Sequence, residues 1–191
     1  MSYGEAFFNI LLIAACCYAM YSLTPADNPY GYVAAAFCFV HGFLDLLQAF
    51  AAEESDECSP ILVLSASIIA AILLPLANIE FYLKSDMSGV ALVHMMSFIP
   101  LLYDMLGKMC DDWDAATDTL NELVLTGNVL SISFLAVQTG NPMYGGIAAI
   151  AFFGRYGSEL IDKFVDGLGP YISTLSNAAV IGLMTYSLTQ G

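Results

Sequence analysis

Two pairs of ionisable residues at helical spacing are the part of the sequence best able to do chemistry. His41 and Asp45 lie four residues apart, and so do Arg155 and Glu159. Residues four apart are neighbours on one face of a helix. Both pairs stand in long apolar stretches, where a charged side chain is costly and usually faces the protein interior. A titratable histidine, carboxylates and an arginine in such a place could form a path for a proton or a cation.

Two further carboxylates extend this candidate site, because they fall toward the same side of the predicted helices as Asp45 and Glu159. The candidate intramembrane polar site therefore comprises His41, Asp45, Arg155, Glu159, Asp104 and Glu122. A structural role stays open beside the functional one, since an Arg–Glu pair can simply neutralise itself and hold helices together. Polar contacts between membrane helices contribute only about 0.6 kcal/mol on average in one well-studied protein.

Other chemistry finds less support in the sequence. His41 and His94 could be axial ligands of a haem or a pigment, because haem iron takes histidine readily. The five cysteines include no CxxC pair, which argues against a zinc site or a disulfide framework. Cys58 and Cys110 could approach each other, although two free thiols are the simpler interpretation. The sequence contains no nucleophile–base pattern, phosphate-binding glycine loop or HExxH motif. We therefore expect no enzyme, no metal and no cofactor beyond bound lipid.

The composition excludes several classes of protein. Of 191 residues, 59% are hydrophobic and only 12% are charged, whereas a soluble domain carries about 25% charged residues. This excludes a disordered chain and an ordinary water-soluble enzyme. With 18 acids against 4 bases the net charge is −14, which repels nucleic acid and excludes a polybasic lipid anchor. The first basic residue is Lys84, so no leader peptide is expected.

Long uncharged runs indicate the elements that must position the ionisable pairs. About 20 apolar residues cross a bilayer, and they must be helical to satisfy their backbone groups. We predict an all-α integral membrane protein with about seven transmembrane helices, and we expect kinks at Pro75 and Pro100. The predicted helices are 5–23, 30–52, 60–84, 89–109, 119–138, 143–164 and 169–190.

The sequence also contains an internal repeat. A shift of 114 places residues 30–50 on 144–164 with 7 identities in 21 positions, and it aligns His41 with Arg155 and Asp45 with Glu159. We predict a three-one-three arrangement: repeat one at 1–84, a linker helix at 89–109 and repeat two at 119–191. Equivalent helices four crossings apart run parallel. This plan is similar to that of SWEET-type sugar transporters, but the proline-glutamine motif of that broader group is absent, so no family is assigned.

Acidic residues gather in the loops on the N-terminal side of the predicted bundle. They could attract a basic partner, although a solvated loop surface explains them equally well. Lysine and arginine counting favours an inside N-terminus only slightly. We expect Trp113 to anchor this side at the interface. The acids on this side are Glu5, Glu53, Glu54, Asp56, Glu57, Asp111, Asp112, Asp114, Asp118 and Asp166.

Two functions are compatible with these features. The leading hypothesis is a structural or accessory subunit of a larger membrane complex, with lipids and other membrane subunits as partners. It relies on short loops, the missing catalytic motifs and stripes of small residues that permit close helix contact. The alternative is a small transporter or channel that moves a proton, a cation or a small solute between the two halves. A cavity between the halves would favour transport, and a dry seam would favour the subunit.

Overall fold

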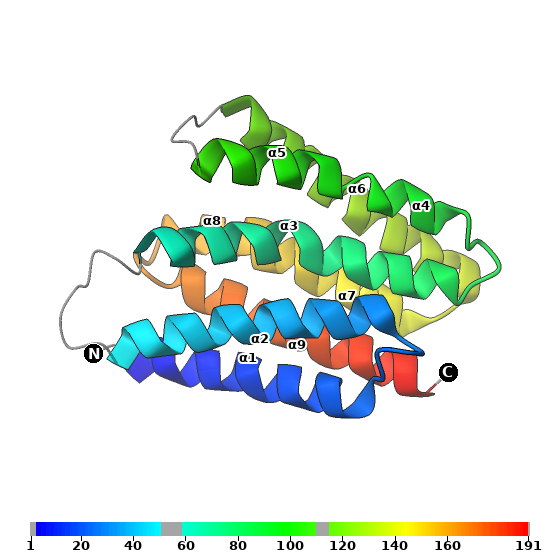
Figure 1. The fold of residues 1–191 in the computed structure, drawn as a ribbon, viewed down its shortest axis with the longest axis horizontal. Coiled ribbons are helices and arrows are strands. Elements are labelled where there is room, and N and C mark those ends of the chain that lie inside the picture. Colours follow the sequence, from blue (N-terminus) through cyan, green and yellow to red (C-terminus); the bar gives the residue numbers. More distant parts are fainter. Residues whose placement is uncertain (1–2, 51–58, 110–114, 191) are drawn as a thin grey trace.

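The structure is a computed structural model that describes residues 3–50, 59–109 and 115–190, and helices dominate all three ranges (Figure 1). Within these ranges there is no strand, which confirms the all-α prediction. The helices are α1 (Tyr3–Ser22), α2 (Pro29–Phe50), α3 (Ser59–Leu83), α4 (Val90–Met95), α5 (Phe98–Met109), α6 (Ala115–Thr139), α7 (Pro142–Phe152), the π-helical turn η1 (Phe153–Gly157), α8 (Ser158–Asp162) and α9 (Gly169–Gln190).

The long helices lie side by side as a ring. Going round it, α1 packs against α2, α2 against α3, α3 against α6, α6 against α7, α7 against α9, and α9 against α1. The short helices α4 and α5 lie outside the ring against α3, and α5 also contacts α6. Figure 1 shows this pair at the margin of the bundle, with α1 beginning and α9 ending at opposite ends. We call α1–α3 the first helix triplet and α6–α9 the second, counting the consecutive elements α7, η1 and α8 as one segment. The two groups contact each other between α3 and α6 and between α1 and α9.

Proline-containing turns begin the later helices, as the sequence indicates. Asn141 accepts a hydrogen bond from the backbone N–H of Met143 at 3.0 Å, and Pro142 occupies the first helical position of α7. Asparagine is a preferred N-cap, and proline fits where no helical N–H bond is required. At the start of α9, the backbone N–H of Gly169 donates to Asp162 at 2.9 Å. Local sequence thus sets where these helices start.

One predicted helix, 89–109, is divided by the structure into α4 and α5, with a break at Met96 and Ser97. Pro100 lacks an N–H and its ring conflicts with the carbonyl group four residues earlier, which is that of Met96. The irregularity expected at Pro100 therefore lies one turn before it. In contrast, α3 continues through Pro75 as a single helix.

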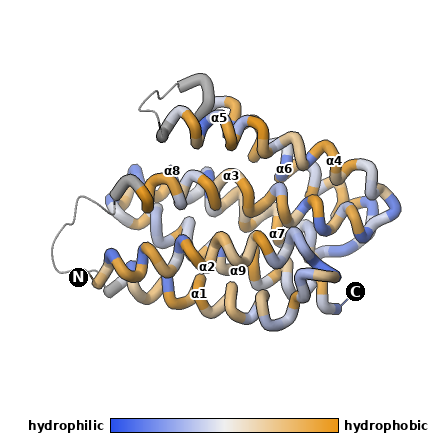
Figure 2. The backbone as a smooth tube through the Cα atoms, viewed as in Figure 1, coloured by the Kyte–Doolittle hydropathy of each residue, from blue (hydrophilic) through white to orange (hydrophobic). Residues whose placement is uncertain are grey.

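The helices fit a membrane environment. Large apolar side chains such as Phe7, Phe37, Leu102 and Leu130 face outward and are exposed, a surface that suits hydrocarbon better than water. Figure 2 shows hydrophobic colouring along most helices and more hydrophilic colouring toward their ends. Among the described residues, five helical stretches are long and apolar enough to cross a bilayer: Gly4–Ser22, Pro29–Phe50, Ile61–Leu83, Val90–Gly107 and Thr119–Thr139.

The prediction of seven crossings goes beyond these five stretches and stays a prediction. The remaining two segments have physical reasons to be less apolar or less continuous. The segment from α7 to α8 is interrupted by η1. The helix α9 carries a group of polar residues in its first half: Ser173, Thr174, Ser176 and Asn177.

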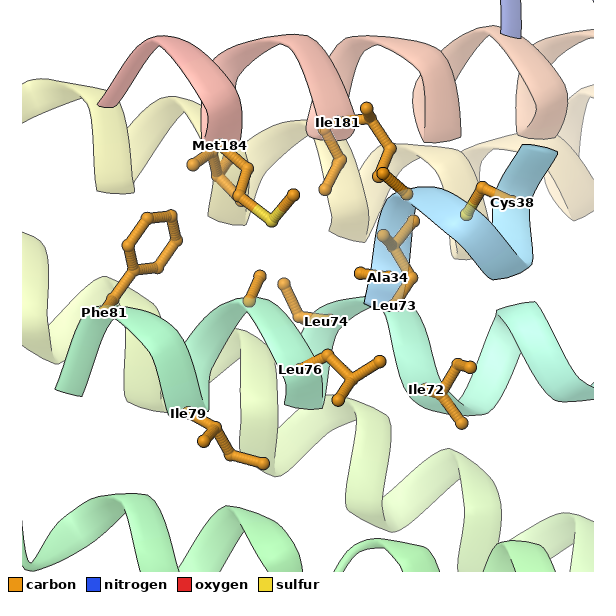
Figure 3. Packing of buried hydrophobic residues seen from close by; sticks show 14 of the residues in the cluster. Ala34, Cys38, Ile72, Leu73, Leu74, Leu76, Ile79, Phe81, Ile181 and Met184 are labelled. Carbon is orange, nitrogen blue, oxygen red and sulfur yellow. The ribbon is translucent and has the colours of Figure 1, made fainter. Parts of the chain in front are cut away.

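A buried apolar core fills one half of the bundle. Figure 3 shows Leu74 and Phe81 of α3 near Ile181 and Met184 of α9, with Ala34 of α2 beside them. All five side chains are buried. The core occupies the second half of α3 and the middle of α9. The six residues of the candidate polar site lie toward the other half of the bundle.

Several sequence predictions fall outside the described residues. They concern the acidic loops, the interfacial tryptophan and two of the cysteines. These residues are Glu53, Glu54, Asp56, Glu57, Cys58, Cys110, Asp111, Asp112, Trp113 and Asp114.

Candidate functional site

Two adjoining cavities lie between the helix triplets. The first, here the inner cavity, has a volume of about 290 Å³ and is lined by α2, α3, α6, α7, η1 and α9. The second, here the outer cavity, has a volume of about 800 Å³ and is lined by α3, α5, α6, η1, α8 and α9. The residues common to both are Ala66, Ala70, Leu125, Arg155 and Ser173. The two cavities therefore adjoin at Arg155.

The inner cavity brings together residues that the sequence placed in different halves of the chain. His41 and Asp45 of α2 line it, and Arg155 of η1 lines it as well. Spacing by four residues puts His41 and Asp45 on one face of α2. Leu73 and Val180, which belong to the buried core, also line this cavity. The inner cavity thus reaches from the ionisable residues to the apolar core.

The two α2 side chains are held by the neighbouring helices. Asn9 of α1 donates from Nδ2 to Asp45 Oδ2 at 2.9 Å. His41 Nδ1 lies 2.9 Å from Ser65 Oγ of α3, and Ser65 Oγ donates to the carbonyl oxygen of Leu62 at 2.9 Å. Because the Ser65 proton is used there, His41 Nδ1 must carry the donor proton. In the neutral imidazole, Nε2 is then the nitrogen with the lone pair.

Arg155 joins two carboxylates at the boundary of the cavities. Its Nε donates to Glu122 Oε1 at 2.7 Å, and its Nη2 contacts the same oxygen. Its Nη1 lies 2.9 Å from Glu159 Oε1. The pairing with Glu159 follows from the four-residue spacing. The partner Glu122 comes from α6, so its pairing with Arg155 could not be predicted from spacing, although Glu122 was predicted as a member of the candidate site.

The outer cavity contains most of the remaining candidate residues. Asp104 of α5, Glu122 of α6 and Glu159 of α8 line it together with Arg155. Asp104 is buried, whereas the side chains of Glu122 and Glu159 retain 34% and 55% of their exposure. The six predicted residues are therefore distributed over two adjoining cavities, and Arg155 lines both.

A π-helical turn positions the guanidinium. Arg155 stands in the middle of η1, and such turns occur frequently at functional sites because they break the regular helical ladder. Gly154 allows η1 to approach α9 closely, since a Cβ at this position would lie 2.4 Å from Ser176 Cβ. Gly154 and Gly157 on either side of Arg155 were the only sequence signal for this turn.

His94 lies in a different environment from His41. Its Nδ1 is 2.7 Å from Asn128 Oδ1 and its Nε2 is 2.9 Å from Ser131 Oγ. Its ring stacks on Tyr82 with 5.2 Å between centroids. Both ring nitrogens are engaged, and His94 lines neither cavity. In this arrangement it offers no nitrogen to iron, and the haem or pigment site stays a prediction. The described ranges contain no cluster of three potential metal ligands.

Sequence reasoning missed a buried amide network next to His94. Asn78 of α3 donates to the backbone carbonyl and to Oδ1 of Asn128, both at 3.0 Å. Asn128 in turn donates to Ser97 at 3.2 Å. The network ties α3 and α6 to the α4–α5 region. Two asparagines within apolar runs were the signal that could have revealed it.

Sequence reasoning also missed the role of Glu80. Its side chain is 2% exposed although Glu80 lies near the end of α3. Its Oε2 accepts hydrogen bonds from the backbone N–H groups of Tyr30 at 2.8 Å and Gly31 at 3.0 Å. These are otherwise unsatisfied donors at the start of α2. The carboxylate therefore caps α2 from α3.

Comparison with known proteins gives one match. A family model described as a domain of unknown function (DUF4791) matches residues 25–188, which extends from the turn before α2 almost to the end of α9. No curated protein and no solved structure matches the chain.

Proposed function

Since the chain belongs to the DUF4791 family, whose description assigns no activity, we propose from its geometry that it is a membrane transporter for a small cationic solute. The solute would pass through the two cavities between the helix triplets. The observation that carries this proposal is the inner cavity, where His41 and Asp45 of one triplet and Arg155 of the other line a common space. Solute sites at the interface of repeated halves are usual in transporters.

The packing of the helices supports a repeated architecture. Exchange α1 with α6, α2 with the α7–α8 segment, and α3 with α9. Under this exchange, the contact between α1 and α2 corresponds to the contact between α6 and α7. The contact between α2 and α3 corresponds to the contact between α7 and α9. The seam between α1 and α9 becomes the seam between α6 and α3. A two-fold axis along the bundle would produce this pattern, with α4 and α5 as the linker of a seven-crossing, three-one-three protein.

The polar contacts support the same exchange. In the first triplet, Asn9 of α1 binds Asp45 of α2. In the second, Glu122 of α6 binds Arg155, which pairs with Glu159. Asn9 and Glu122 are separated by 113 positions, close to the shift of 114 that aligns Asp45 with Glu159. Each triplet thus uses a residue of its first helix to hold the ionisable pair of its second.

The charges favour a cation as the solute. The lining residues of the two cavities include four carboxylates, those of Asp45, Asp104, Glu122 and Glu159, and one guanidinium, that of Arg155. A negative cavity raises the local concentration of cations. The apolar residues of the inner cavity would contact the carbon skeleton of an organic cation, while a carboxylate fixes its charged end.

Flux measurements test this proposal. The purified protein is reconstituted into liposomes, and uptake of radiolabelled choline is compared with uptake of glucose as a neutral probe. We expect choline uptake that falls about tenfold or more in Asp45→Asn, as loss of one charge-assisted contact implies. The matched control is Asp86→Asn, an exposed acid that lines neither cavity.

Two results would overturn the proposal. Choline uptake that is unchanged in Asp45→Asn, or glucose uptake without choline uptake, would reject a cationic solute bound at this carboxylate. Absence of both fluxes, together with migration in a large assembly on native gels, would reject transport. It would leave the accessory-subunit role predicted from the sequence, to which the exposed apolar side chains are equally suited.

A further inference from the structure

We propose that Asp45 and Asn9 form a proton-binding site, and that the bound proton exchanges with the cationic solute at the Asp45 carboxylate. The exchange rests on the proposed transport function, but the proton site itself does not. The starting observation is a contact between a buried amide and a carboxylate that leaves one hydrogen-bonding group unused.

Asn9 is 2% exposed, so its amide must find its partners within the protein. Its Nδ2 donates to Asp45 Oδ2 at 2.9 Å. Its Oδ1 is buried and has no hydrogen-bond partner in the structure. Such an oxygen requires a donor, and an ionised carboxylate beside it offers only acceptors. The pair is therefore incomplete while Asp45 is charged.

Protonation of Asp45 would complete the pair. When the carboxylate takes one proton from solution in the inner cavity, Oδ1 becomes a hydroxyl group that can donate to Asn9 Oδ1. Asn9 Nδ2 continues to donate to Asp45 Oδ2. The result is a cyclic carboxyl–amide pair with two hydrogen bonds, which satisfies the orphaned oxygen. Release of the proton to the cavity restores the carboxylate and its single bond.

The charged groups around Asp45 include no cation that pairs with it among the described residues. His41 lies one turn earlier on α2, and Glu5 lies one turn before Asn9 on α1. Across the cavity stands Arg155, whose charge is balanced by Glu122 and Glu159. The cavity-lining residues of α3, α6 and α9 are uncharged. The hydrogen bond from Asn9 is thus the contact that positions the Asp45 carboxylate.

The second triplet shows the contrast. Glu122 occupies the place of Asn9, Arg155 that of His41, and Glu159 that of Asp45. Arginine does not lose its proton in proteins, so this half carries a fixed ion cluster. The first half instead carries a carboxylate and an imidazole without an arginine. The carboxylate of Asp45 can bind either a proton or the ammonium group of the solute, so the two ligands compete for one site. Such competition is the basis for exchanging a proton for the solute.

Infrared spectroscopy tests the proton site without reference to transport. The full chain in lipid nanodiscs is titrated with acid, and the carbonyl stretch of protonated carboxyl groups is followed. We expect a component that is absent in Asp45→Asn and retained in Glu159→Gln, the matched acid of the other half. In Asn9→Leu the component should persist at higher frequency, because the carboxyl group has lost its amide partner.

Three results would overturn the proton site. The first is a carbonyl-stretch titration of Asp45→Asn that is identical to that of the unmodified protein. The second is a carbonyl component that disappears in Glu159→Gln and not in Asp45→Asn. The third is a carbonyl frequency that is unchanged in Asn9→Leu. The last comparison remains decisive if Asp45→Asn does not fold. The exchange is tested by choline uptake into liposomes with an acidic interior, which should exceed uptake without a gradient several-fold. Choline uptake that does not depend on the proton gradient would reject exchange but not transport. An infrared component of Asp45 without any choline flux would reject transport but not the proton site.

Discussion

Arg155 binds Glu122, which lies 33 residues earlier on a different helix, as well as its own helical neighbour Glu159. Two nitrogens of the guanidinium reach one oxygen of Glu122, and the third reaches Glu159. The guanidinium therefore fastens α6 to η1 at the point where the two cavities meet. An ion pair that bridges helices constrains the fold more than one that closes a single helical turn.

This difference predicts an order of stability for two glutamine variants. Glu122→Gln removes a carboxylate that receives two donors, and we expect it to lower the free energy of unfolding by about 1–2 kcal/mol. Glu159→Gln removes a more exposed i,i+4 partner, which should cost only about 0.3–0.5 kcal/mol. Thermal unfolding in detergent followed by circular dichroism measures both. The opposite order would contradict the bridging role of Glu122.

Gly154 should not tolerate even a methyl group. Its added Cβ would lie 2.4 Å from Ser176 Cβ, so Gly154→Ala must push η1 away from α9. Overpacking of this kind costs about 1–3 kcal/mol. Gly182→Ala in α9 is the control, because nothing lies within 4 Å of a Cβ there. Adding Ser176→Gly to Gly154→Ala should restore part of the lost thermal stability, and no restoration would show that the contact is not the cause.

Loss of Glu80 should destabilise the start of α2. Glu80→Ala leaves the backbone N–H groups of Tyr30 and Gly31 without their acceptor, at an expected cost of about 1–3 kcal/mol. Glu80→Gln keeps an acceptor oxygen and should cost less. The exposed acid Asp86 provides the control Asp86→Ala. Equal melting temperatures for Glu80→Ala and Asp86→Ala would refute the capping role.

The reactivity of the Cys17 thiol tests whether the exposed face of α1 lies in lipid or in water. Cys17 is exposed on α1, within the stretch Gly4–Ser22, while Cys16 and Cys38 are buried. In a protein with Cys58→Ser and Cys110→Ser, reconstituted into vesicles, Cys17 should react with a lipid-soluble maleimide but not with a charged one. Asp86→Cys, in a loop, should react with the charged reagent once the vesicles are permeabilised. Equal reactivity of the two positions would place α1 in water.

Local sequence signals predicted the helices better than their interruptions. Asn141 and Pro142 mark the start of α7 because capping and ring geometry act within a few residues. The break before Pro100 was expected as a kink, and its place one turn earlier follows from the carbonyl of Met96. The π-turn at Arg155 depends on contact with Ser176 of α9, which no local pattern contains.

The candidate site was predictable only where its contacts lie within one helix. Spacing gives the pairing of Arg155 with Glu159 and the shared face of His41 and Asp45. The contacts of Asn9 with Asp45 and of Glu122 with Arg155 connect different helices. They depend on how the helices pack, and helix packing is decided by many weak apolar contacts rather than by a motif.

The apolar core fills one half of the bundle and the cavities occupy the other. Backbone amides around Leu76 and Ile181 should therefore exchange with deuterium more slowly than those around Ala66 and Ser173, where few neighbours resist local opening. Local opening is therefore expected on the side of the bundle that holds the cavities and Arg155, and not in the half that the core fills. An off-centre hydrophobic core thus determines which half of the bundle opens locally, in addition to stabilising the fold.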